Sequence, residues 1–187
     1  ILPSDILNIQ NSKAFIFAGY EVMMETLSKN ILEDEKKLQI QTINSLANIK
    51  KQASVISNKF NTQEISEKRV QEIENLFISA KKSIEEKGIN EIPVYVHFHQ
   101  QAFAKSLGLN VVGVFGPNEI TAKNIEDISK IENVLIIDNI HNQLANPFLE
   151  VNKKANIISW RNFPNKDEDK ALFNMLKNNI EDLINIY

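Results

Sequence analysis

Four short apolar runs divide the second half of the chain. Each is rich in β-branched or aromatic residues, which favours a buried strand. The runs cover residues 94–99, 111–115, 134–138 and 156–160. Stretches with helical character separate and follow them. This alternation predicts a doubly wound α/β fold for residues 90–187, with helices on both faces of a four-stranded parallel sheet.

Four helices are expected around these strands. The first is a short piece over residues 102–107, and the second begins at Thr121. The third covers residues 142–152, and the last covers residues 167–187, where apolar residues recur at helical spacing. A helix between consecutive strands is typical of parallel strands joined by right-handed crossovers.

The first part of the chain has a weaker pattern. Ser4 or Asp5 can cap a short helix, and residues 14–18 form an apolar run that predicts a strand. A helix is expected over residues 22–27. Between residues 38 and 58 the patterning is poor, and we expect at most a marginal strand at residues 54–56.

The longest helical pattern runs from about Thr62 to Lys87, and Gly88 follows as a stop signal. Its apolar residues recur at spacings of three to five and form one stripe. The stripe consists of Ile65, Val70, Ile73, Leu76, Phe77, Ala80 and Ile84. We therefore expect a partial N-terminal α/β lobe over residues 1–60, a connecting helix over residues 61–88 and a C-terminal α/β lobe over residues 89–187.

Composition and charge exclude several classes of function. The 187 residues carry a formal net charge of -3 and no cysteine. The absence of a basic cluster argues against a nucleic-acid partner, and the absence of cysteine excludes disulfides, thiolate metal sites and cysteine nucleophiles. No apolar run approaches the roughly 20 residues that a membrane helix needs. The chain begins at Ile1, which we interpret as a mature or trimmed N-terminus.

Polar residues of metal-ligand type end three of the four predicted strands, the fourth of which runs into residues 160–164. His97 and His99 end the first, and Asp138 and His141 follow the third. Residues i and i+2 of a strand share a face, and the carboxyl ends of parallel strands meet in one crevice. Imidazoles with one carboxylate suit Zn²⁺ or Mn²⁺. The alternative is structural: the histidines can bond nearby backbone, and Asp138 and Asn142 can cap the next helix.

Other chemistry has less support. Neither a dinucleotide-binding glycine pattern nor a phosphate-binding loop is present, because residues 113–116 lack the Lys and Ser/Thr that such a loop needs. No serine occupies a nucleophile elbow. His97, Asp138 and His141 are compatible with a metal-dependent hydrolase, but nothing marks a nucleophile or a general base. We therefore do not predict an enzyme.

The segment from His97 to Leu109 resembles the family of metal-binding receptors of ABC importers for zinc and manganese. In that family a ligand histidine opens a segment H-x-x-x-x-x-F-A-x-x-x-G-L, and this histidine falls on His97. Residues 2–6 and 14–19 resemble the first lobe of the family, and the helix predicted at 62–87 resembles its connecting helix. The resemblance implies a divalent metal ion, zinc or manganese, an ABC permease as partner, and an extracytoplasmic location, periplasmic or at the cell surface.

The chain also departs from the family pattern. The first ligand histidine of the family precedes the P-S-D stretch, before Ile1, and residues 31–61 contain no histidine for the second. The last family ligand, an aspartate, corresponds to Asn162. Only His97 carries over, so a site with His99, Asp138 and His141 is expected to be either rearranged or shared with sequence outside this chain. A receptor-fold interaction module that binds no metal is therefore a further alternative, beside the hydrolase.

Overall fold

The computed structural model describes residues 2–21, 24 and 33–187. Its chain forms two compact units, one of Ile1–Thr42 and Lys50–Ser66 and the other of Ile43–Ile49 and Glu67–Tyr187. Of the helix predicted over residues 22–27, all but residue 24 lies outside the described residues. None of the helices in the described ranges combines the length and the apolar character that crossing a bilayer requires.

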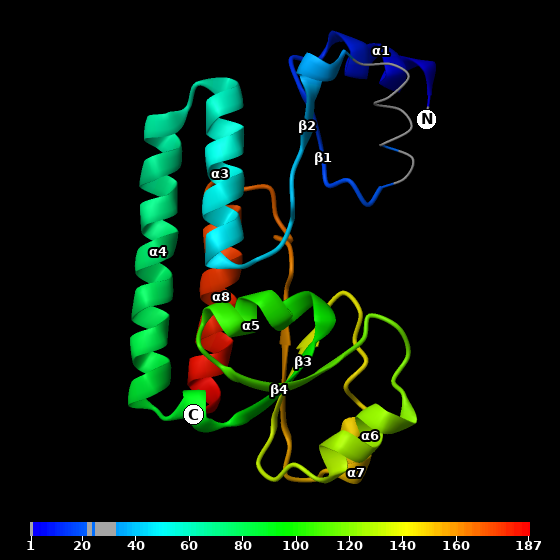
Figure 1. The fold of residues 1–187 in the computed structure, drawn as a ribbon, viewed down its shortest axis with the longest axis vertical. Coiled ribbons are helices and arrows are strands. Elements are labelled where there is room, and N and C mark those ends of the chain that lie inside the picture. Colours follow the sequence, from blue (N-terminus) through cyan, green and yellow to red (C-terminus); the bar gives the residue numbers. More distant parts are fainter. Residues whose placement is uncertain (1, 22–23, 25–32) are drawn as a thin grey trace. The chain divides into compact units, whose positions relative to one another are not determined.

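A four-stranded parallel sheet organises the larger unit (Figure 1). Its strands are β3 (Pro93–His97), β4 (Asn110–Phe115), β5 (Leu135–Asn139) and β6 (Asn156–Trp160). They lie in the order β4-β3-β5-β6, and every pair is parallel. The predicted doubly wound sheet is confirmed.

Alternate residues of the central strands pack against opposite layers of helices. Val94 and Val96 of β3 pack against α4 (Gln63–Glu86), α5 (Gln101–Ser106) and α8 (Ala171–Ile186) in one core cluster. Tyr95, between them, belongs to a second cluster that includes α6 (Ala122–Ser129) and α7 (Phe148–Val151). Because β-strand side chains alternate between faces, both faces of the sheet are covered by helices, as predicted.

The helix starts were predicted with mixed success. α6 begins as expected, because the Thr121 side chain accepts a hydrogen bond from the backbone N–H of Asn124 at 3.2 Å. The helix predicted over residues 142–152 is wrong in its first half: only α7 is helical, and residues 143–147 form a loop and turn. α8 begins at Ala171 rather than at Asp167.

The smaller unit contains α1 (Pro3–Asn11) and a parallel pair of strands, β1 (Phe15–Phe17) and β2 (Lys37–Gln39). A 3₁₀ turn (Asp34–Lys36) precedes β2. The carboxylate of Asp5 accepts a hydrogen bond from the backbone N–H of Leu2 at 2.8 Å, so it caps α1 from within the first turn.

Two long helices, α3 (Leu46–Phe60) and α4, contribute to both units. The continuous helix predicted from about Thr62 to Lys87 is confirmed by α4, although Ile65 of its apolar stripe is exposed. The marginal strand predicted at residues 54–56 is wrong, because these residues belong to α3. Buried and half-buried residues of α3 recur every three to four positions, at Leu46, Ile49, Ala53 and Ile56.

Candidate functional site

The strand order creates one reversal of direction, between β3 and β5. From β3 the chain continues to β4 on one side, and from there to β5 and β6 on the other. Ligands of open α/β proteins bind outside the carboxyl ends of the strands at such a switch point. His97 is the last residue of β3, and Asp138 and Asn139 are the last two of β5. Of the predicted site residues, His97 and Asp138 therefore lie at the switch point, where the topology favours ligand binding.

His97 is completely buried at this edge. Its Nδ1 accepts a hydrogen bond from the backbone N–H of His99 at 3.2 Å, and its Nε2 lies 3.5 Å from Nδ2 of Asn142. Gly116 packs against the same nitrogen: a Cβ atom added there would lie 2.7 Å from Nε2. Burial lowers the pKa of His97, as does the proximity of His99, while the charge of Asp138 raises it. Both ring nitrogens thus contact protein groups, and the ring favours its neutral form.

His99 lies outside the strand. β3 ends at His97, and residues Phe98–Gln100 form a 3₁₀ turn. The expectation that His97 and His99 share one face of a strand is therefore wrong, because the backbone turns between them. The turn still brings the two imidazoles together, with ring centroids 5.3 Å apart and an interplanar angle of 33°.

Asp138 holds backbone groups of the next loop. Its carboxylate accepts hydrogen bonds from the N–H groups of Asn139 at 2.8 Å, Leu144 at 3.0 Å and Ala145 at 2.9 Å. The residue is 3% exposed. A buried carboxylate is stabilised by several N–H donors of this kind. The structure therefore gives Asp138 the backbone-bonding role that was the alternative to metal ligation, although for a loop instead of a helix start.

His141 lies against the loop that follows β6. Its ring stacks on Phe163, with centroids 3.8 Å apart and an interplanar angle of 14°. Burial lowers the pKa of His141, and so does the positive charge of Arg161. Nearby, Asn142 donates a hydrogen bond from Nδ2 to the backbone carbonyl of Pro117 at 2.8 Å, which connects this loop to the one after β4.

The structure therefore brings His97 and His99 together and places the charge of Asp138 near them, while His141 stacks on Phe163. Nowhere in residues 2–21, 24 and 33–187 do three His, Asp or Glu side chains gather closely enough to hold a metal ion. Ligation by His97, His99, Asp138 and His141 stays a prediction.

Buried amides at the same edge were missed by sequence reasoning. Gln100 is completely buried and donates from Nε2 to the carbonyl of Trp160 at 3.0 Å and to Oδ1 of Asn139 at 3.3 Å. Within the described residues, Oε1 of Gln100, Nε1 of Trp160 and Oδ1 of Asn162 are buried without a hydrogen-bond partner. The only sequence signal is that Gln100 and Asn162 closely follow predicted strands.

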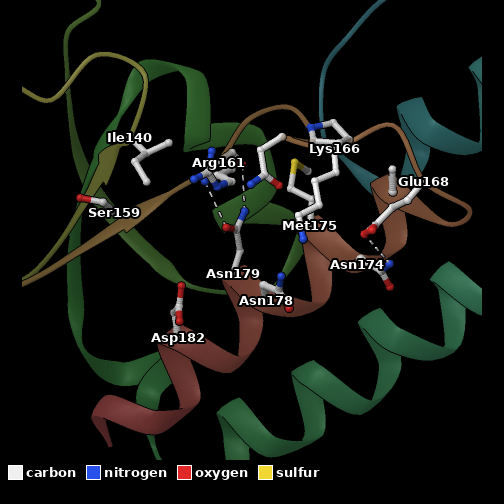
Figure 2. Close-up of a pocket in the computed structure, with 13 residues that line it drawn as sticks. Ile140, Ser159, Arg161, Lys166, Glu168, Asn174, Met175, Asn178, Asn179 and Asp182 are labelled. Atoms are coloured by element: carbon white, nitrogen blue, oxygen red, sulfur yellow. Dashed lines mark hydrogen bonds between the residues drawn. The ribbon is translucent and has the colours of Figure 1, made fainter.

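A polar pocket of about 340 Å³ lies between the loop after β6 and α8. Figure 2 shows Arg161 in the upper part of this view, with Ser159 to its left, Lys166 and Glu168 to its right, and Asp182 below it. Asn179 of α8 is buried and bonds the backbone of Arg161 twice, accepting from its N–H at 3.1 Å and donating to its carbonyl at 2.8 Å. No sequence motif signals this pocket, because its two sides are 18 residues apart.

Neither family models nor curated proteins match the chain. Solved structures do. A Zn(II)-bound variant of AdcAII from Streptococcus pneumoniae has a TM-score of 0.67 at 12% identity, over 99% of this chain and 84% of that one. An Mn-bound periplasmic metal binding protein from Candidatus Liberibacter asiaticus has a TM-score of 0.66 at 14% identity, over 100% and 85%. The Cd-bound form of that protein has a TM-score of 0.67 at 14% identity, over 100% and 84%.

At these identities the likeness establishes the fold. The chain has the architecture of periplasmic metal-binding proteins over nearly its whole length. This agrees with the fold class expected from the residues 97–109 and from the alternation of strands and helices.

Proposed function

We propose that the chain is an extracytoplasmic receptor that captures a divalent metal ion, zinc or manganese, and delivers it to an ABC permease. The observation that carries the proposal is that its fold matches Zn- and Mn-bound proteins over 99–100% of the chain. The histidine of the segment His97–Leu109 supports it, because His97 ends β3 at the switch point of the sheet. Such a role involves binding and release and no covalent chemistry.

His97 and His99 form the centre of the proposed metal site. Their rings are neighbours, and imidazole nitrogen suits both metals. Metal-ligating histidines usually donate their second ring N–H to a protein group, but Nδ1 of His97 accepts a bond from the backbone N–H of His99. Binding a metal at Nε2 therefore has to move the ring proton to Nδ1, and the contact with the His99 N–H must break.

Asp138 and His141 are the other members of the proposed set. The charge of Asp138 acts on His97 even though its oxygens bond backbone N–H groups, so it favours a cation at His97. His141 follows β5 on the same loop that carries Asn142, and Asn142 contacts Nε2 of His97. A metal that displaces Asn142 therefore moves the loop that also bears His141.

Isothermal titration with Zn²⁺ and with Mn²⁺ tests the proposal on wild type, His97→Ala and His99→Ala. Asn110→Ala is the matched control, because it is exposed and lies at the opposite end of the sheet. We expect His97→Ala to weaken binding by at least about 100-fold, since loss of a mere outer-shell group already costs roughly 10–100-fold. Asn110→Ala should bind like wild type.

NMR chemical shifts provide a second test, because they report on individual groups around His97. Metal bound at Nε2 of His97 should shift the backbone amide resonance of His99 and the side-chain amide resonance of Asn142, because both groups contact the ring. Absence of binding by wild type, or equal affinity of wild type and His97→Ala, would favour an interaction module with the receptor fold.

A further inference from the structure

The pocket beside α8 has a chemistry different from that of the histidine edge. At the histidine edge His97 and Asp138 are buried and bond backbone N–H groups, whereas His99 and His141 are exposed. The pocket has a volume of about 340 Å³, within the range of sites for small organic ligands. Its wall carries charged and amide side chains from the segment Ser159–Lys166 and from α8.

Arg161 is the best-placed binding group of this pocket. Its backbone is fixed on both sides by Asn179, which is 3% exposed. Its guanidinium has no hydrogen bond or ion pair with any described residue, although it lines the pocket. An Arg whose backbone is held and whose fork of N–H donors is unused is suited to bidentate recognition of a planar carboxylate.

The other charges of the wall decide what kind of anion fits. Lys166 adds a second cation, while Asp182 and Glu168 add two carboxylates. Oε1 of Glu168 accepts a hydrogen bond from Asn174, whereas Asp182 has no partner among the described residues. The formal charge of these four side chains is balanced, so a dianion is not favoured. A ligand that carries both a carboxylate and a cationic group complements Arg161 and Asp182 together.

We propose that this pocket binds a small zwitterion of the α-amino-acid type. Its carboxylate bonds Arg161 and Lys166, and its ammonium group faces Asp182. The amide of Asn178, on the exposed surface of α8 at the pocket, contacts the rest of the ligand. None of the four proposed metal ligands lines the pocket, although the charge of Arg161 also acts on His141, so amino-acid binding is tested without metal.

The test is ligand-observed NMR, followed by titration calorimetry, with the twenty L-amino acids as probes and a metal chelator present throughout. We expect at least one amino acid to bind. Its primary amide, which lacks the carboxylate, should bind at least about tenfold more weakly, because charge-assisted bonds to Arg161 are lost. Inorganic phosphate and succinate are the control ligands for dianion binding, and both should bind more weakly than the amino acid.

Two variants locate the binding. Arg161→Gln should weaken the amino acid at least about tenfold while Asn179 still holds its backbone. Asn178→Ala should also weaken it, because the amide contact with the rest of the ligand is lost; Asn185→Ala, on the same helix and exposed but outside the pocket, should not. The proposal is overturned if no amino acid binds, or if the amide binds as tightly as the amino acid. It is also overturned if phosphate or succinate binds more tightly than the amino acid, or if both pocket variants bind the amino acid as tightly as wild type does.

Discussion

The two polar regions at the carboxyl side of the sheet differ in how their side chains are engaged. At the ends of β3 and β5, His97, Asp138 and Gln100 are buried and bond backbone groups. Beside α8, the guanidinium of Arg161 and the carboxylate of Asp182 line a pocket and bond no side chain among the described residues. The comparison shows that a residue of metal-ligand type such as Asp138 can serve to hold a loop, and that a polar pocket can arise without any sequence motif.

The largest change in stability is expected at Asp138, in the region at the ends of β3 and β5. Asp138→Ala leaves the N–H groups of Asn139, Leu144 and Ala145 without their acceptor, two of them buried. It should lower the free energy of unfolding by about 3–5 kcal/mol, since each unsatisfied buried donor costs roughly 1–3 kcal/mol. Urea denaturation measures this change. Asp182→Ala, the control from the pocket, should change stability by no more than about 0.5 kcal/mol.

The next effect tests how tightly His97 is enclosed. Gly116→Ala adds a Cβ only 2.7 Å from Nε2 of His97 at a backbone φ of +69°. Gly108→Ala is the control: Gly108 has a similar φ of +82°, but a Cβ added there meets no atom within 4 Å. Its loss of stability, about 1–2 kcal/mol, therefore measures the cost of the backbone conformation alone. Overpacking should add a further ~1–3 kcal/mol at Gly116. Equal thermal stability of the two variants would show that His97 is loosely enclosed.

A smaller effect is expected where the pocket is built on α8. Asn179→Ala removes both hydrogen bonds to the backbone of Arg161 and should cost about 2 kcal/mol in chemical denaturation. Asn178→Ala, one residue away and exposed, should be within about 0.5 kcal/mol of wild type. If the two substitutions cost the same, Asn179 does not fix Arg161.

The smallest effect is the pH dependence from His97, measured with a metal chelator. Burial lowers the pKa of His97 in the folded chain, whereas the unfolded chain binds the proton near pH 6.5. The stabilisation is therefore complete above about pH 6.5 and is lost as the pH falls from there toward the lowered pKa. In His97→Gln the stability should fall less steeply over that interval. Parallel profiles would contradict the assigned burial effect.

Sequence reasoning succeeded where a local pattern decides the structure. The β-branched runs of β3 and β5 and the apolar stripe of α4 are such patterns, because buried strands and helices repeat their hydrophobic residues at fixed periods. α3 was missed although Leu46 and Ile49 recur at helical spacing, since the polar residues between them obscured the pattern.

Sequence reasoning failed where distant groups decide the structure. The shortened α7 depends on Asp138, which bonds the N–H groups of the loop before it. The position of His141 depends on Phe163, which is 22 residues further along the chain (163 − 141). The pocket depends on Asn179 finding the backbone of Arg161. No spacing rule relates these partners, so only the three-dimensional structure reveals them.

The close packing of Gly116 on His97 also affects how fast a metal could bind. An ion that is to reach Nε2 must wait until Gly116 or Asn142 withdraws from the ring. If that withdrawal is slower than diffusional encounter, the observed association rate levels off as the metal concentration rises. The plateau equals the opening rate of the protein, so Zn²⁺ and Mn²⁺ would reach the same maximal rate despite different affinities.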